Sequence, residues 1–281
     1  MVCQIDDNEK SIAVSGELKE QKMNIARKII EAHKLKFGSL PPLQQCSVSR
    51  STFYQGDCLV EMDKIADNSV DLVCTDPPYT VTKSGDYKGT GFINGHWRED
   101  KNTSNRNAKK GKIFKENEIK FSDWMPEIYR VLKQQTHFYC MTNDLHLKTV
   151  IEEGIKSGFK QQNILVWAKG MHTPTQYYFK NIEFIVMFRK GKAKYINKIG
   201  TKALINIDGI RNKVHPSEKP FELMQLLIEN STNENEIVLD PFMGLGSTGI
   251  ACKKTGRHFI GIEKDEKYFN VAVRRVSEYC G

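Results

Sequence analysis

Apolar residues in this chain gather in short runs and amphipathic stretches that alternate from Thr52 onward. Unbroken apolar runs between turn residues predict buried strands, and apolar residues at helical spacing predict amphipathic helices. The predicted strands are Thr52–Gln55, Val70–Thr75, Thr136–Met141, Asn163–Trp167, Ile182–Phe188, Ile237–Asp240 and His258–Glu263. The predicted helices are Leu59–Ala66, Phe121–Lys133, Leu145–Ser157, Phe221–Glu229, one that opens at a glycine turn and runs through Ala251, and Lys267–Tyr279. This alternation is typical of an α/β fold.

Two long stretches do not follow the alternation. Residues 1–50 contain a charged amphipathic pattern between Gly16 and Phe37, which predicts a helical appendage to a main domain of residues 51–281. Residues 80–118 are polar, rich in Lys, Gly and Asn, and show no periodicity. A stretch of this kind predicts a mobile functional loop, with plain disorder as the alternative.

The net charge of +8 favours an anionic partner. Between residues 169 and 213, ten basic residues stand against Glu183 and Asp208, an excess equal to that of the whole chain. Aromatic residues such as Tyr178 and Tyr195 are interleaved with these charges, which favours a nucleic-acid contact segment over a merely solvated lysine face. The lysines predicted to contact phosphates are Lys190, Lys192, Lys194 and Lys198 in this segment and Lys83, Lys88, Lys109 and Lys110 in the polar loop.

Other features of the composition exclude several classes of protein. The seven cysteines show no CxxC motif and no Cys/His metal spacing, so reduced thiols and no metal site are expected. The densest apolar stretch, Phe184–Phe188, has the length of a strand and is too short to cross a bilayer. The first residues lack the basic and apolar parts of a secretory signal. A cytoplasmic protein without a membrane partner is therefore expected.

The predicted strand Val70–Thr75 ends at the turn Asp76-Pro77-Pro78-Tyr79. Two consecutive prolines cannot continue a sheet ladder, so the turn is stiff and extended. The Asp76 carboxylate and the backbone carbonyls accept hydrogen bonds, and Tyr79 supplies an aromatic face for stacking. This combination suits a nucleobase with an exocyclic amine, and the alternative is a plain proline-containing loop at a strand end.

A glycine turn follows the predicted strand Ile237–Asp240, with Gly244, Gly246 and Gly249 before a helix and Glu263 at the tip of the next strand. Such glycines let the backbone approach a ligand, and the acid can bind a ribose diol, so an adenosine-containing cofactor is expected. An NAD-dependent dehydrogenase is the rival interpretation. The acid and the bulky aromatic residue before the glycines, and the lack of a second mononucleotide half downstream, argue against it.

Together these motifs resemble those of the β-group SAM-dependent amino-methyltransferases of DNA, which methylate the exocyclic amine of adenine or cytosine. Asp76–Tyr79 matches the family's catalytic motif, Asp240–Gly246 its SAM-binding turn, and His215–Pro220 the segment before that turn. The resemblance covers about residues 52–280. It implies a circularly permuted, Rossmann-like methyltransferase fold with a mostly parallel, seven-stranded sheet in the spatial order 3-2-1-4-5-7-6.

The resemblance also implies a mechanism. The implied catalytic residues are Asp76, Pro77, Pro78 and Tyr79. Asp76 and the Pro77 carbonyl accept hydrogen bonds from the two N–H groups of the target amine, so that its nitrogen aims a lone pair at the sulfonium methyl group. The base has to leave the duplex for this reaction, and Tyr79 replaces the lost stacking.

A further set of residues is implied to bind SAM. These are Asp57, Cys58, Asp76, His215, Lys219, Pro220, Asp240, Phe242, Gly244, Gly246, Ser247, Thr248, Glu263 and Lys264. Glu263 is expected to hold the ribose hydroxyls, Asp57 to face the adenine, and Lys219 to line the methionine end. Asp240 is expected to buttress the turn, and His215 is more consistent with a structural role near a helix cap.

The identity of the base and of the partners is less closely defined. In the family an aspartate-led motif accompanies adenine more often than cytosine, which favours adenine N6, with cytosine N4 as the alternative. A catalytically silent DNA-binding protein on the same scaffold is a further alternative. The expected partner is double-stranded DNA in a bacterial or phage-type cytoplasm, and the expected product of the cofactor is S-adenosyl-L-homocysteine. Two further partners are left as alternatives: a second copy of the chain, forming a homodimer that spans a DNA site, and a cognate restriction endonuclease.

Overall fold

The computed structural model describes residues 50–78, 119–173, 178–210 and 218–279, with the backbone alone for residues 171–173. Several expectations fall outside these ranges. They are the helix between residues 16 and 37, the loop of residues 80–118, and the single residues Tyr79, Lys83, Lys88, Lys109, Lys110 and His215.

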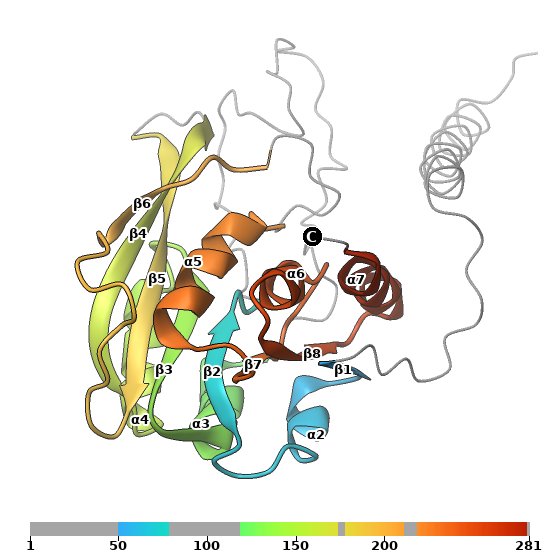
Figure 1. The fold of residues 1–281 in the computed structure, drawn as a ribbon. Coiled ribbons are helices and arrows are strands. Elements are labelled where there is room, and N and C mark those ends of the chain that lie inside the picture. Colours follow the sequence, from blue (N-terminus) through green and yellow to red (C-terminus); the bar gives the residue numbers. More distant parts are fainter. Residues whose placement is uncertain (1–49, 79–118, 174–177, 211–217, 280–281) are drawn as a thin grey trace, which may run out of the picture. The chain divides into compact units, whose positions relative to one another are not determined.

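A single sheet of eight strands lies at the centre of the described fold, in the order β1-β8-β7-β2-β3-β5-β4-β6 (Figure 1). The strands are β1 Ser51–Gln55, β2 Val70–Thr75, β3 Leu132–Thr142, β4 Lys160–Thr173, β5 Lys180–Lys190, β6 Leu204–Asn206, β7 Ile237–Asp240 and β8 His258–Glu263. Strand β5 is antiparallel to both of its neighbours, β3 and β4, and the other pairs are parallel. The first seven strands of this order reproduce the expected spatial order, and the Rossmann-like α/β fold is confirmed.

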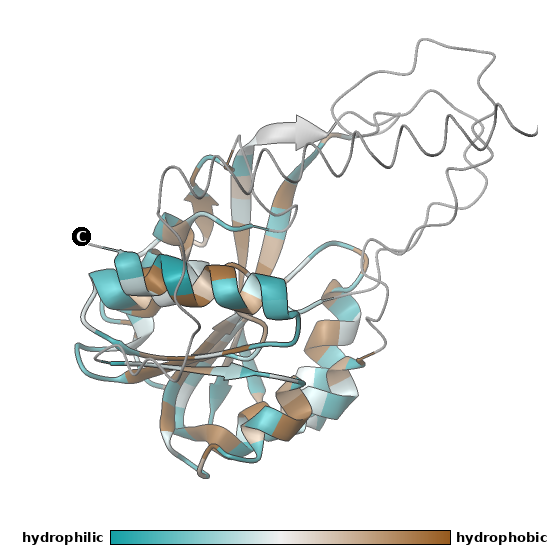
Figure 2. Cartoon of the chain, turned by 90° about the vertical axis from the view of Figure 1, so that its right-hand side faces the viewer, coloured by the Kyte–Doolittle hydropathy of each residue, from teal (hydrophilic) through white to brown (hydrophobic). Residues whose placement is uncertain are grey.

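Helices cover both faces of the sheet. They are α2 Cys58–Met62, α3 Phe121–Val131, α4 Leu147–Lys156, α5 Phe221–Ser231, α6 Ser247–Lys254 and α7 Glu266–Glu278. Hydrophilic and hydrophobic residues alternate along these helices, as amphipathic surface helices require (Figure 2). None of the described helices is long and apolar enough to span a membrane.

Two apolar clusters, one on each face, hold the layers together. All six residues of β2 are buried, as expected of a central parallel strand. Its Val73 packs in the cluster with Trp124 of α3, whereas Leu72 packs in the other cluster with Leu223 of α5. Because successive residues of a strand point to opposite faces, one apolar run serves both clusters.

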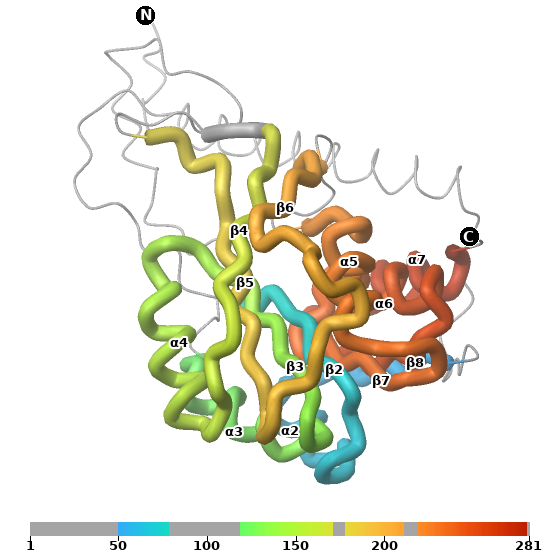
Figure 3. Tube along the Cα trace, turned by 60° about the vertical axis from the view of Figure 1, so that its left-hand side comes forward, coloured from blue at the N-terminus to red at the C-terminus, as the bar shows by residue number. Residues whose placement is uncertain are grey.

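The eighth strand is a difference from the expected seven. Residues Leu204–Asn206 pair in parallel with β4 at the edge of the sheet, on the side of β4 away from β5 (Figure 3). The Trp167 indole Nε1 donates to the Ile207 carbonyl at 2.8 Å and anchors this segment. A three-residue strand with one buried residue, Ile205, carries no periodicity that sequence patterning can detect.

The topology gathers acidic residues at one edge of the sheet. Strands β1, β8, β7 and β2 are consecutive and parallel, so their carboxyl ends share that edge. Asp240 and Glu263 are the last residues of β7 and β8, while Asp57 and Asp76 follow β1 and β2 closely. Ligands of open α/β sheets bind at this edge.

Candidate active site

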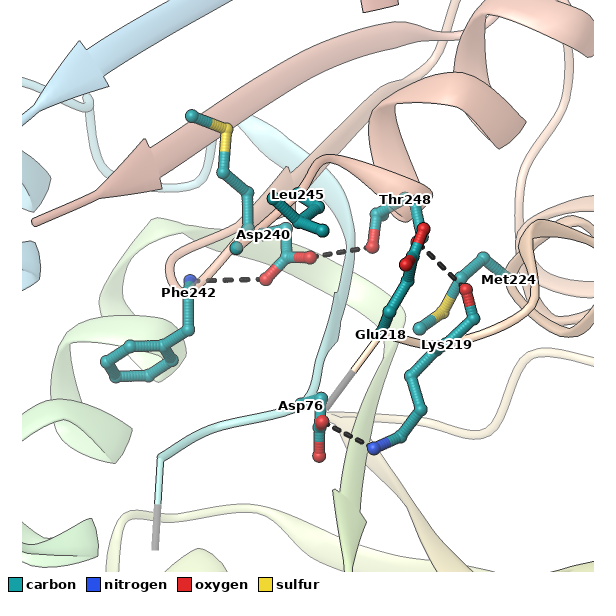
Figure 4. Close-up of a pocket in the computed structure, with 11 residues that line it drawn as sticks. Asp76, Glu218, Lys219, Met224, Asp240, Phe242, Leu245 and Thr248 are labelled. Atoms are coloured by element: carbon teal, nitrogen blue, oxygen red, sulfur yellow. Dashed lines mark hydrogen bonds and ion pairs between the residues drawn. The ribbon is translucent and has the colours of Figure 1, made fainter. Parts of the chain in front are cut away.

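A pocket that opens to solvent lies at this carboxyl edge, and the empty space within it and at its mouth is about 380 Å³ (Figure 4). It is lined by Asp76, Glu218, Lys219, Met224, Asp240, Phe242, Met243, Gly244, Leu245, Ser247 and Thr248. The proline turn after β2 and the glycine turn after β7 therefore open onto one cavity, although they are far apart in the sequence. This is the juxtaposition that the sequence motifs predict.

Asp240 connects the two turns. Its carboxylate accepts hydrogen bonds from the Thr75 hydroxyl at 2.6 Å, the Thr248 hydroxyl at 2.6 Å and the Phe242 amide at 3.1 Å. Burial raises the pKa of Asp240 to about 6. Because Thr75 ends β2 and Thr248 lies in α6, the predicted buttressing role of Asp240 has a direct structural basis.

The glycine turn has a left-handed backbone at two positions. Gly244 has φ 51° and Gly246 has φ 79°, a region that side chains of L-residues rarely adopt. A Cβ atom on Gly246 would stand 3.1 Å from Val276 Cγ2 and 3.2 Å from Ala272 Cβ of α7. The turn thus brings the N-terminus of α6 close to the pocket and to α7 at once.

Glu263 holds the glycine turn from the neighbouring strand. Its Oε2 accepts from the Gly244 amide at 3.0 Å, and its Oε1 accepts from the Asp265 amide at 2.9 Å. Burial raises the pKa of Glu263, and these backbone donors act in the opposite direction. A carboxylate oxygen can accept more than one hydrogen bond, so Glu263 retains acceptor capacity for ligand hydroxyls.

Asp57 and its neighbours lie further along the same edge, outside the lining of the pocket. Asp57 caps α2 by accepting from the Leu59 amide at 3.1 Å, and Lys264 contacts Asp57 Oδ2 at 3.2 Å. Cys58 is buried at the start of α2, and burial raises the pKa of its thiol to about 12. These contacts keep the predicted adenine-side residues together at the tips of β1 and β8.

Lys219 connects Asp76 to two residues that the motifs do not include. Its Nζ lies 2.6 Å from Asp76 Oδ2 and 3.2 Å from Glu183 Oε2. Glu183 in turn contacts Lys169 Nζ at 3.1 Å. Burial alone would raise the pKa of Glu183, but the Lys219 and Lys169 ammonium groups outweigh it and lower that pKa below its usual value.

Glu218 is a further lining residue that sequence reasoning missed. Its carboxylate contacts Arg275 Nη2 at 2.8 Å, and Arg275 Nη1 donates to the Leu245 carbonyl at 3.1 Å. The Ser247 hydroxyl donates to the Lys219 carbonyl at 2.8 Å. The segment before α5 is therefore tied to both α7 and the glycine turn. Its adjacency to Lys219 in the sequence is the signal that could have identified Glu218.

The remaining predicted residues have mainly supporting positions. Phe242 lines the pocket and packs edge-on against the Trp124 ring, with the ring centroids 5.1 Å apart. Pro220 is buried and forms the N-cap of α5. Pro77 is buried and Pro78 half-buried directly after Asp76.

The basic segment requires one correction. Lys190 was expected to contact DNA, but it is only 3% exposed. Its ammonium group donates to the Asn68 side chain at 2.9 Å and to the carbonyls of Tyr129 and Leu132 at 2.6 Å each. An ammonium group that is buried and donates to three internal acceptors has no hydrogen left to donate to a phosphate. The prediction for Lys190 is therefore wrong, because its side chain secures the end of β5.

The other described lysines of the segment are accessible to different degrees. Lys192 and Lys198 are exposed and Lys194 is half-buried. Lys198 forms an ion pair of 2.5 Å with Glu229. Two aromatic residues of the same segment, Tyr178 and Tyr195, are 95% and 85% exposed.

The fold and the pocket define this protein as a Rossmann-like α/β protein with a ligand site at the carboxyl edge of its sheet. The profile of the N6_N4_Mtase family, described as DNA methylase, matches residues 70–206 and 198–274. These ranges contain all of the residues that line the pocket and more than half of the chain. The chain belongs to this family of DNA methyltransferases.

Individual relatives agree with this assignment. The chain is 30% identical over 234 residues to the putative methylase YubD of Escherichia coli, covering 81% of this chain and 90% of the relative. It is 27% identical over 248 residues to the type II methyltransferase M2.MboI of Moraxella bovis, covering 80% and 87%.

Solved structures share the fold. The M1.HpyAVI–SAM complex matches with a TM-score of 0.60 at 24% identity, covering 80% of this chain and 99% of that one. The cytosine-N4-specific PvuII DNA methyltransferase matches with a TM-score of 0.62 at 16% identity, covering 83% and 88%.

Proposed function

We propose that this protein transfers a methyl group from SAM to the exocyclic N6 amine of an adenine that is flipped out of double-stranded DNA. One observation carries the proposal: Asp76 of the proline turn and the glycine turn after Asp240 line the same pocket. A hydrogen-bond acceptor for an amine thus lies beside a turn of the kind that binds adenosine cofactors. Membership of the DNA methylase family and the SAM complex of M1.HpyAVI support the choice of cofactor.

The residues at the carboxyl edge fit SAM by their chemistry. Glu263 retains acceptor capacity for the ribose hydroxyls, Phe242 offers an apolar wall, and the left-handed turn at Gly244 and Gly246 lets the backbone come close to the ligand. When bound, SAM supplies an electrophilic methyl group on a sulfonium. Asp57 and the Cys58 backbone are assigned to its adenine.

Asp76 acts on the target amine. The lone pair of an aromatic amine is delocalised into the ring, so the amine is a weak nucleophile. If Asp76 and the Pro77 carbonyl accept hydrogen bonds from its two N–H groups, the nitrogen is oriented and its lone pair becomes available. The amine gains positive charge in the transition state, and the Asp76 carboxylate stabilises that charge. Tyr79, outside the described residues, is assigned to stacking on the flipped base.

The choice of adenine over cytosine rests on the aspartate that leads the motif. A match to the cytosine-N4-specific PvuII enzyme at 16% identity concerns the fold and leaves the base to experiment. DNA from cells that express the chain should be hydrolysed to nucleosides and analysed by mass spectrometry. The proposal expects N6-methyladenine above the level of a vector control. Detection of N4-methylcytosine would reassign the base. The absence of both products would point to a DNA-binding protein without transfer activity.

A further inference from the structure

A row of alternating charges extends from the pocket into the sheet. Lys219 Nζ lies 2.6 Å from Asp76 and 3.2 Å from Glu183, and Lys169 Nζ lies 3.1 Å from Glu183. Asp76 and Lys219 line the pocket, whereas Glu183 and Lys169 stand behind that lining. We name these four residues the charge row.

The members of the charge row come from separate elements that the topology brings to one edge. Glu183 lies near the start of the antiparallel strand β5, and Lys169 lies near the end of β4. Glu183 is paired in register with Trp167 of β4, two residues before Lys169. The hairpin thus places a carboxylate and an ammonium group where β2 ends, and Lys219 reaches them from the segment before α5.

Burial makes these charges interact strongly. The side chains of Lys219, Glu183 and Lys169 are 6%, 18% and 22% exposed, so water screens them little. A lysine has a flexible stem and a compact charge, and by itself it would not fix the direction of a carboxylate. Held between two carboxylates from different elements, Lys219 has one position instead of many.

We propose that Glu183 is a positioning residue that, together with Lys169, holds the Lys219 ammonium group and thereby orients the Asp76 carboxylate toward the target amine. This inference rests on the proposed function, because it assigns a task within the same site. Glu183 acts through Lys219 and does not touch the substrate. Nothing in the sequence motifs points to it.

The net charge of the charge row predicts how a substitution of Glu183 changes the barrier to methyl transfer. With two carboxylates and two ammonium groups, the row is neutral, so the Asp76 carboxylate keeps its ability to stabilise a developing cation. Replacing Glu183 by Gln leaves an excess of one positive charge beside the amine nitrogen that becomes positive in the transition state. The change should raise the barrier to transfer without altering the walls of the SAM pocket.

The test is a kinetic comparison of the full-length protein with Glu183→Gln. We expect kcat for methyl transfer to fall about ten- to a hundredfold, less than the loss of a group that contacts the reacting atoms. The Kd for SAM, measured by calorimetry, and the KM for DNA should stay within about threefold, since Glu183 does not line the pocket. Glu61→Gln is a matched control, because Glu61 is also buried and bonded to one lysine, Lys64 at 2.6 Å, outside the pocket lining.

A double-mutant cycle separates positioning from mere structural support. If Glu183 acts through Lys219, Glu183→Gln should cause little further loss of kcat in a Lys219→Met background. Lys169→Met, which also stands behind the lining, should still lower kcat, because Glu183 loses a partner and holds Lys219 less firmly. The excess negative charge that it leaves would by itself favour the developing cation, so a fall of kcat in this variant reports positioning and gives a second test if Lys219→Met does not fold. Glu183→Asp, which keeps the charge, should recover part of the loss.

Several outcomes would overturn the inference. Unchanged kcat in Glu183→Gln, losses that multiply in the double variant, or a parallel loss of SAM affinity and thermal stability would each do so. Failure of the proposed function would be seen differently, because the wild-type protein itself would then transfer no methyl group to DNA. An active wild type with an equally active Glu183→Gln variant would refute the positioning role alone.

Discussion

Three largely buried carboxylates near the pocket differ in how their charge is compensated. Asp240 has two hydroxyl donors and one amide, and Glu263 has two amides. Glu183 has two lysines instead, and its pKa is lowered whereas the pKa values of Asp240 and Glu263 are raised. Neutral hydroxyl and amide donors therefore bind Asp240 and Glu263, the acids that hold the glycine turn. Two ammonium groups bind Glu183, which is linked to Asp76 through Lys219.

The raised pKa of Asp240 predicts a pH dependence of stability. Its folded-state pKa of about 6 lies above the usual 3.8, so the folded state binds this proton more tightly. The resulting stabilisation is present below about pH 4 and is lost as the pH rises to about 6. The free energy of unfolding of the wild type, relative to Asp240→Asn, should fall by about 3 kcal/mol across this window. Denaturant titrations of both proteins at several pH values measure it, and a constant difference would contradict the prediction.

At the residue scale the sequence identified the groups that belong to motifs and missed those that do not. Asp76 and Asp240 stand in recognisable turns, and the structure places both in the pocket. Glu183 and Lys169 lie on strands without any motif, and Lys219, which contacts Glu183, is distant in the sequence, so only the folded chain shows the contacts. Lys190 was misjudged because a charge count cannot distinguish a buried ammonium group from an exposed one.

At the scale of elements, the central strands and the glycine turn could be read from the sequence. Strands β2, β7 and β8 have the predicted bounds, because their apolar runs stop at turn residues. Strands β4 and β5 are longer than predicted, since their antiparallel pairing continues into polar residues. Pairing partners, rather than local pattern, determine where such strands end.

The glycine turn yields a prediction with an internal control. Gly246→Ala and Gly200→Ala both place a side chain at positive φ, 79° and 89°, which costs about 1–2 kcal/mol in each case. A Cβ atom at Gly200 meets nothing within 4 Å, whereas one at Gly246 would press on Val276 and Ala272. Gly246→Ala should therefore lose more unfolding free energy than Gly200→Ala and should also bind SAM more weakly. Equal losses in denaturant titrations would mean that the close packing of the turn against α7 is unimportant.

At the scale of the whole molecule, the arrangement of the sheet explains why residues from four distant stretches act together. The parallel strands direct their carboxyl ends to one edge, and the antiparallel β5 adds the start of its own strand to that edge. The sequence predicted this order through family resemblance, whereas the added strand β6 and the charge row emerge only from the folded chain.

The basic segment can be tested by its salt dependence. Replacing Lys192, Lys194 and Lys198 by Gln should weaken DNA binding and flatten the slope of log affinity against log salt, by about 0.9 for each phosphate that these lysines no longer neutralise. The same substitutions at Lys64, Lys148 and Lys156, which are exposed on α4 and beside α2, provide a control of equal charge. Fluorescence anisotropy at several salt concentrations measures both slopes. Identical slopes in the two triple variants would remove the segment from the DNA interface.

The most direct measurement is the comparison of SAM binding with methyl transfer in Asp76→Ala. Binding by calorimetry should stay within about threefold of the wild type, because the glycine turn and Glu263 are intact, while transfer of a radiolabelled methyl group to DNA should fall by about a hundredfold or more. Near-normal turnover in this variant would contradict the assignment of Asp76 as the acceptor of the target amine.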